Sequence, residues 1–173
     1  MPTPLELLYR EIPLTQGQVA IVDAGDYDWL NQWKWCAVSK RHKFYAARNI
    51  TTHPGKQSLV YMHRIILGLD VQGSDFKDNR CLTGDHVNRD TLDNRRINLR
   101  LATKSQQVWN TSAHIGSTSG LKGASFDKRA GKWRADICHK HKKVYIGCFS
   151  TPEEAHSAYC EYASRLRGDY AIA

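Results

Sequence analysis

The residues best suited to chemistry lie together in the segment from Cys81 to Ser112. Asp85 is followed directly by His86, and Asn98 and Gln107 come later in the same segment. Carboxylate and amide oxygens are ligands that Mg²⁺ and Mn²⁺ prefer, and a neutral imidazole can take a proton from water near pH 7. The segment therefore has the composition of a hard-metal site with a general base beside it.

Two strands and a helix are expected to hold these side chains. Arg80–Leu82 and Ile97–Thr103 flank a loop rich in Asn, Asp and Arg, which is typical of a hairpin, so the Asp-His pair would follow the first strand. Thr103 and Gln106 fit a capping box, which predicts a helix beginning near Lys104. One face of that helix would carry residues three and four positions apart. These residues are Gln107, Asn110 and Thr111.

The run DHVNRDTLDNRRINLRLATKSQ resembles the HNH family of nucleases in the form common among homing and phage-type enzymes. The resemblance implies metal-dependent hydrolysis of phosphodiester bonds in DNA, with His86 activating the attacking water and Asp85 binding the cation, Mg²⁺ or Mn²⁺. Asn98 would fix the loop that aims the His. Gln107 stands where the family usually has His or Asn as the second metal ligand, and Asn110, one turn on, is a substitute candidate.

The segment before this motif is expected to supply the hydrophobic core that so short a motif cannot bury alone. Its hydrophobic patterns predict several strands and one short helix. A second helix beginning near Tyr61 would bury Ile65, Ile66 and Leu69 and leave His63 and Arg64 on other faces; Arg64 is a candidate phosphate contact. The strands are predicted at 19–22, 34–38, 44–50 and 58–62, and the first helix at 23–32.

Residues 114–120 are rich in small and polar side chains, which predicts a flexible linker. After it, strands are predicted at Gly123–Asp127, Lys132–His139 and Lys143–Phe149, the second alternating apolar and polar residues. A helix should follow, because Thr151, Pro152 and Glu154 form a capping box with Pro at the first position, and Gly168 marks its end. One face of this helix is expected to pack on the sheet, and it carries Ala155, Ala158, Tyr159, Tyr162, Ala163 and Leu166.

This C-terminal segment resembles the AP2 DNA-binding domain in the skeleton G-K-W-R-A-D-I and Y-I-G-x-F-S-T-P-E-E-A. The resemblance implies that the sheet face opposite the helix lies in the major groove of DNA. The candidate contacts are Lys122, Ser125, Asp127, Arg129, Arg134, Asp136, Cys138, Lys143 and Tyr145.

Composition agrees with a nucleic-acid partner. The chain has 173 residues, of which 41% are hydrophobic and 24% charged, as expected of a globular protein. Its net charge of +8 and pI near 9.3 favour a polyanionic partner, and double-stranded DNA is the expected one. The protein itself is expected to be a monomer rather than a dimer.

The five cysteines are scattered and form no C-x-x-C pair, so we expect reduced thiols and no structural zinc. No apolar run approaches the length of a membrane span, and no signal-peptide pattern opens the chain. These features predict a soluble, cytoplasmic protein without a membrane partner, in a bacterial or phage-infected cell.

The expected architecture is therefore α+β. A mixed β/α nuclease domain at 1–113, with its ββα-metal motif at about 80–112, would precede the linker at 114–120 and an AP2-like domain at 121–173, a three-stranded antiparallel sheet plus one helix. The leading hypothesis is a DNA endonuclease. A non-catalytic DNA-binding regulator with a degenerate HNH fold is the alternative, and an RNA-binding module has less support because no single-strand stacking motif is evident.

Overall fold

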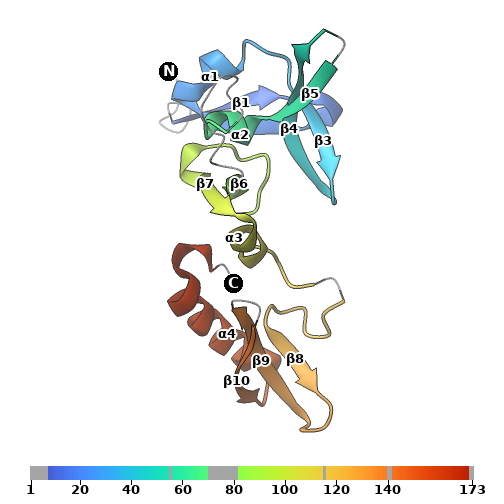
Figure 1. Cartoon of the computed structure of the whole chain (residues 1–173), viewed down its shortest axis with the longest axis vertical. Helices are drawn as coiled ribbons and strands as arrows, with labels where there is room; N and C mark the ends of the chain where they lie inside the picture. Colours follow the sequence, from blue (N-terminus) through green and yellow to red (C-terminus); the bar gives the residue numbers. More distant parts are fainter. Residues whose placement is uncertain (1–7, 55, 70–81, 115, 140–141, 172–173) are drawn as a thin grey trace. The chain divides into compact units, whose positions relative to one another are not determined.

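The computed structural model describes residues 8–54, 56–69, 82–114, 116–139 and 142–171 (Figure 1). The chain divides into two compact units, Met1–Lys104 and Ser105–Ala173. Both combine antiparallel strands with helices, so the α+β class is confirmed, while the predicted linker at 114–120 stays a prediction. In the described part of the chain, no helix is both long and apolar enough to span a bilayer.

The first unit begins with a two-stranded sheet and continues with a three-stranded one in the order β3-β4-β5. Each sheet is followed at once by a short helix, and the predicted elements are confirmed with bounds that shift by up to three residues. The elements are β1 (Tyr9–Pro13), β2 (Val19–Asp23), α1 (Ala24–Leu30), β3 (Cys36–Lys40), β4 (Lys43–His53), β5 (Lys56–Tyr61) and α2 (Met62–Ile66).

The motif forms a hairpin of β6 (Leu82–His86) and β7 (Leu99–Thr103), followed by α3 (Lys104–Trp109). The helix begins where the sequence predicts. The first strand runs further than predicted, because Asp85 and His86 pair with Arg100 and Leu99 and so belong to the ladder instead of following it. The predicted start of that strand, at residues 80 and 81, lies outside the described residues.

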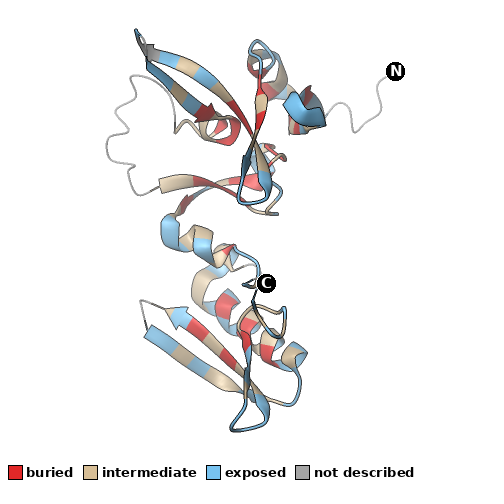
Figure 2. Cartoon of the chain, turned by 90° about the vertical axis from the view of Figure 1, so that its right-hand side faces the viewer, coloured by how far each residue is buried: buried red, intermediate tan, exposed pale blue. Residues whose placement is uncertain are grey.

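One core joins the hairpin to the upstream elements. Ile12, Val22, Leu30 and Met62 are almost completely buried, and Leu99 of β7 packs into the same cluster. Figure 2 colours the strands and helices by burial. The expectation that the upstream segment supplies the core of the motif is confirmed. Leu99 precedes Arg100 and pairs with His86, so this burial also fixes the register on which the site depends.

The second unit has the three strands and the helix that the sequence predicts. Its sheet, ordered β10-β9-β8, is covered on one face by α4, whose N-terminus carries the expected capping box of Thr151 and Glu154. Ala135, Ile137 and Tyr159 are buried between them. The elements are β8 (Ala124–Asp127), β9 (Lys132–His139), β10 (Lys142–Phe149) and α4 (Pro152–Arg167).

Candidate active site

Asp85 and Arg100 face each other across the β6–β7 hairpin. The Nε and Nη2 atoms of Arg100 each lie 2.9 Å from Oδ2 of Asp85, and the aspartate is only 8% exposed. A carboxylate is a hard donor that suits a hard divalent cation. A cation bound at Asp85 would share this carboxylate with a guanidinium.

His86 is buried among aromatic rings. The centroid of the His63 ring lies 4.9 Å from that of His86 in an edge-to-face arrangement, and the Tyr45 ring lies 6.3 Å away. Tyr61 closes the group against His63 at 5.7 Å. The prediction that His63 faces away from the core is wrong: it is 7% exposed, because α2 turns His63 inward together with Met62 and Ile66.

Asn94 supplies the polar partner of the His86 ring. Its Oδ1 lies 3.4 Å from Nε2 of His86, and its own Nδ2 donates to the backbone oxygen of Leu92. Asn94 is 1% exposed, and its backbone nitrogen donates to the oxygen of Ile21 on β2. The amide that meets His86 is therefore fixed by the neighbouring sheet.

Burial keeps both histidine rings neutral. Desolvation lowers the pKa of His86, and this outweighs the hydrogen bond with Asn94 and the charge of Asp85, which raise it. Burial and the nearby His86 lower the pKa of His63 to about 3. At neutral pH His86 can therefore accept a proton, which a general base requires.

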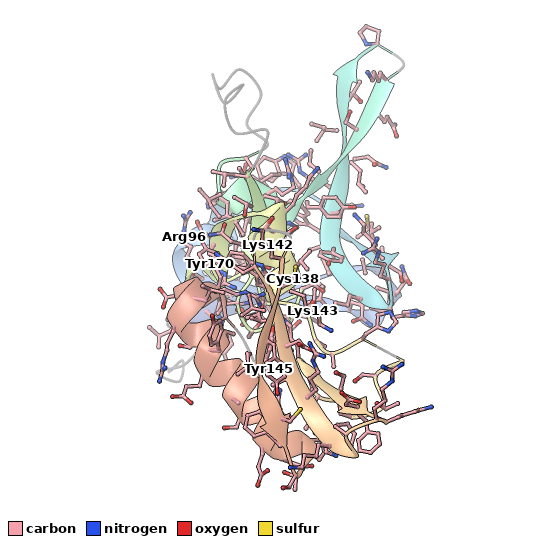
Figure 3. The ribbon with its side chains drawn as sticks, turned by 60° about the horizontal axis from the view of Figure 1, so that its bottom comes forward. Arg96, Cys138, Lys142, Lys143, Tyr145 and Tyr170 are labelled. Carbon is pink, nitrogen blue, oxygen red and sulfur yellow. The ribbon has the colours of Figure 1, made fainter. Side chains whose placement is uncertain are left out.

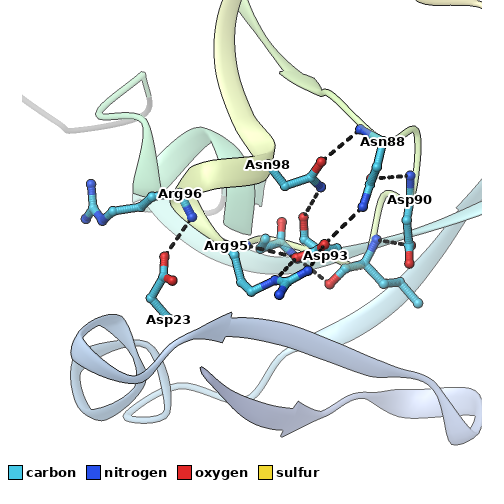
Figure 4. A network of polar contacts seen from close by, with 9 residues as sticks. Asp23, Asn88, Asp90, Asp93, Arg95, Arg96 and Asn98 are labelled. Atoms are coloured by element: carbon cyan, nitrogen blue, oxygen red, sulfur yellow. Dashed lines mark hydrogen bonds and ion pairs between the residues drawn. The ribbon is translucent and has the colours of Figure 1, made fainter. Parts of the chain in front are cut away.

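Asn98 ties the two ends of the loop between the strands together (Figure 4). Its Oδ1 accepts from the backbone nitrogen of Asn88 at 2.8 Å, and its Nδ2 donates to the backbone oxygen of Asp93 at 2.7 Å. The Asp93 carboxylate in turn accepts from Asn88 and Arg95. The loop that carries Asn94 is therefore held by its own side chains.

The same loop is fastened to the first sheet and to α1. The backbone nitrogen of Ile21 donates to Leu92, and the Arg96 backbone donates to Asp23. The Arg96 guanidinium makes two bonds of 2.7 and 2.8 Å to Asp26, whose pKa burial raises and these bonds lower, with a net decrease. The first sheet and α1 therefore brace the loop whose Asn94 contacts the His86 ring.

The predicted second metal ligand belongs to the other unit. Gln107 and Asn110 lie on or just after α3 and group with Ser105–Ala173, so their roles stay predictions. In the ranges that the structure describes, no cluster of three or more His, Cys, Asp or Glu residues is placed to hold a metal. Of the three predicted ligands, Asp85 lies in the first unit with His86, and Gln107 and Asn110 lie in the second.

The predicted DNA-contact residues fall into two groups. Arg64 lies on α2 and is half-buried. Strand pairing places most of the rest on one face of the C-terminal sheet, where Ser125 meets Arg134, and Asp136 meets Tyr145. Figure 3 labels Tyr145, Lys143 and Cys138 along this sheet. That face is the one opposite α4, as expected. Cys138 and Lys143 form a further cross-strand pair there.

Local contacts order this polar face. Asp136 accepts from Arg134 at 2.9 Å and lies 3.0 Å from Nζ of Lys143, while the Arg134 guanidinium lies 4.9 Å from the Tyr145 ring centroid. Arg129 is exposed in the β8–β9 turn. Lys122 differs, because its ammonium donates to backbone oxygens of Trp109 and Thr111 and so holds the segment after α3.

Sequence reasoning missed three residues beside His86. Tyr45 and Asn94 carried no signal, since an aromatic residue in a strand and an Asn in a loop are commonplace. His63 was considered only as part of the helix beginning near Tyr61, and helical periodicity placed it on the wrong face. Arg100 was recoverable in principle: once the register is known, it is opposite Asp85.

Comparisons with known proteins agree with the nuclease resemblance. The chain is 29% identical to an uncharacterized HNH endonuclease of Acanthamoeba polyphaga mimivirus over an alignment of 150 positions, covering 85% of this chain and 74% of the relative. It is 36% identical to protein 3.8 of Escherichia phage T7 over 88 positions, covering 45% of this chain and 73% of the relative. No protein-family profile and no solved structure matches. The chain therefore belongs to the family of the phage T7 protein, and most of its length is similar to a viral protein named as an HNH endonuclease.

Proposed function

We propose that this protein is a divalent-metal-dependent DNA endonuclease of the HNH type found among homing and phage enzymes. One observation carries the proposal: His86, which follows the metal-ligand candidate Asp85 directly on β6, is buried and neutral, and its ring meets the fixed amide of Asn94. The similarity to a protein named as an HNH endonuclease supports it. Homing and phage-type enzymes of this kind cut DNA, so duplex DNA is the proposed substrate.

His86 is the proposed general base. If its Nε2–H donates to Asn94, the lone pair of the neutral ring is on Nδ1, which takes a proton from water. The water oxygen then bonds to phosphorus while the bond from phosphorus to the leaving sugar oxygen breaks, and that oxygen takes a proton from solvent. Asp85 would hold a Mg²⁺ or Mn²⁺ ion, with Gln107 or Asn110 as the proposed further ligand, and the charge of that ion would stabilise the pentacovalent phosphate.

The second unit is proposed to bind duplex DNA through the polar face of its sheet, as an AP2-like domain does. Arg134, Lys143 and Tyr145 lie on that face, and Lys143 and Tyr145 are exposed. Joining two DNA-binding units in one chain raises the local concentration of DNA near each, so neither needs high affinity alone. A monomer suffices for this arrangement.

A second function is favoured by a specific contact. The ion pair of Asp85 with Arg100 occupies Oδ2 of the proposed metal ligand, and Gln107 departs from the usual ligand types. A protein that kept the HNH fold and bound DNA without cutting it would tolerate both features. The alternative is therefore a non-catalytic DNA-binding regulator.

Nicking of supercoiled plasmid separates the two functions. The nuclease should nick with Mg²⁺ or Mn²⁺ and not with chelator, and His86→Ala should slow nicking by roughly 10²- to 10⁴-fold, as expected for loss of a general base. DNA binding should survive. His114→Ala is the matched control, since His114 is exposed and lies in the second unit. If the wild-type protein binds DNA but does not nick it, the nuclease function is refuted and the regulator function is supported.

A further inference from the structure

The turn between β3 and β4 presents four consecutive basic or imidazole side chains. Lys40 pairs with Lys43 across the two strands, and Arg41 and His42 form the two-residue connection between them. All four residues are exposed. Among the described residues, no carboxylate forms an ion pair with Lys40, Arg41 or Lys43.

This turn breaks two local rules of hairpin stability. Arg41 and His42 have φ values of 49° and 65°, a left-handed geometry for which Asn and Gly are the favoured residues. Lys40 and Lys43 are like charges placed directly opposite each other, which destabilises a strand pair. Violations of local preference that persist in a folded protein are expected at functional positions.

Strand register directs the turn toward the candidate active site. Cross-strand partners share a face and successive pairs alternate, so Lys40 and Lys43 lie on the same face as Tyr45, two residues further along β4. The Tyr45 ring contacts both His63 and His86. The face of the hairpin that carries the lysines is thus the face that borders His86.

Two hydrogen bonds tie the turn to the loop that follows His86. Nζ of Lys43 donates to the backbone oxygen of Arg89 at 2.8 Å, and Oγ1 of Thr91 donates to the backbone oxygen of Phe44. Arg89 is itself left-handed, with φ of 67°, and its backbone nitrogen donates to the oxygen of His86. The turn and the loop that follows His86 are therefore one connected edge of the first unit.

We infer that the β3–β4 turn is a second DNA-contact surface, which binds backbone phosphates of duplex DNA next to the phosphate that His86 faces. This inference rests on the proposed nuclease function and adds to it the contact that positions the scissile strand. Lys40 and Arg41 are the phosphate ligands, and Lys43 holds the turn against the loop. Phosphates are the fitting partner because such contacts require cations and no base-specific geometry.

The test compares two variants with equal loss of charge. Lys40→Gln/Arg41→Gln removes two charges from the turn, and Lys34→Gln/Lys56→Gln removes two from the same unit away from it: Lys34 precedes β3, and Lys56 pairs with His53 at the far end of β4. Each full-length protein is titrated with a short duplex of arbitrary sequence in chelator, over a range of salt concentrations.

The turn variant should lower the slope of log affinity against log salt by about 2, since each phosphate contact contributes roughly 0.9, and should weaken binding roughly 10- to 100-fold near 0.1 M salt. The control variant should keep the wild-type slope. Arg41→Asn/His42→Gly is a further variant whose residues suit the left-handed turn, so it should fold at least as well as the wild type, and it should lower the slope by about 1.

An equal effect of the turn and control variants, or no effect of either turn variant, would overturn the inference. So would a slope change seen with single-stranded RNA but not with duplex DNA. Because binding is measured in chelator, the result does not depend on catalysis. A wild-type protein that fails to nick plasmid in a separate Mg²⁺ reaction would refute the nuclease function while leaving the slope measurement readable.

Discussion

Adding a side chain at Gly84 should destabilise the protein as long as His63 is present. Gly84 lies on β6, one residue before Asp85, and a Cβ atom added there would stand 2.6 Å from Cδ2 of His63 and 3.0 Å from Cδ1 of Leu67. Real Cβ atoms do not approach carbon so closely. The His63 ring cannot simply swing aside, because it is buried against His86 and a pair of tyrosine rings.

The cost of Gly84→Ala follows from this overlap. Forcing an extra methyl group into a packed core costs about 1–3 kcal/mol. For a unit of this size, each kcal/mol corresponds to a fall of roughly 4–8 °C in Tm. Gly25→Ala is the matched control, since a Cβ there meets nothing within 4 Å and Ala favours the helix α1 in which Gly25 lies.

A double-mutant cycle tests the cause. His63→Ala removes the ring that Gly84→Ala would strike, so the double variant should be more stable than the sum of the single effects predicts, by about 1–2 kcal/mol. Urea unfolding followed by tryptophan fluorescence measures all four proteins. Additive effects would show that the strain at Gly84 does not come from His63, and the packing argument for His86 would lose its support.

Three further results are expected. Acid should destabilise the protein, because an unfolded histidine binds a proton below pH 6.5 whereas His63 stays neutral to about pH 3. The free energy of unfolding should therefore fall by roughly 2 kcal/mol between pH 6.5 and 4.5, and the urea midpoints of His63→Phe should depend less on pH. Asn98→Ala removes two hydrogen bonds and should cost about 2–4 kcal/mol, with hydrogen exchange of the Asn88 amide accelerated. Gly123→Ala should unfold the second unit at ambient temperature, seen as loss of exchange protection in α4, because Gly123 has φ of +81° and its Cβ would overlap Tyr159 at 2.1 Å.

The second unit shows how much local signals can establish. The capping box at Thr151, the Pro at the first helical position and the Gly at 168 each act within one turn of helix, and α4 begins and ends where they predict. In β9, alternation of Trp133, Ala135 and Ile137 with polar residues needs only neighbours in sequence, and its bounds were predicted without error. Such features need no knowledge of the tertiary fold.

The surroundings of His86 could not be predicted in the same way. Asn94 meets His86 because Ile21, far away in sequence, fixes the backbone of the loop, and no local pattern encodes that contact. The inward turn of His63 depends on the space that Gly84 leaves on another strand. The motif resemblance identified the histidine and the aspartate, while the residues that position them follow from contacts between distant segments.

Left-handed backbone at non-glycine residues indicates where this unit gives up stability. Gln16 is one such residue, and its side chain offsets the strain by donating to the backbone oxygen of Ala37 at 2.8 Å. The others described are Arg41, His42 and Arg89, all in the turn and loop that border His86. Each left-handed residue costs roughly 1–2 kcal/mol, so a turn made of Asn and Gly would be more stable. Because the strained residues are two arginines and a histidine rather than the residues that suit the geometry, the edge beside His86 is better suited to holding an anion than to holding the hairpin together.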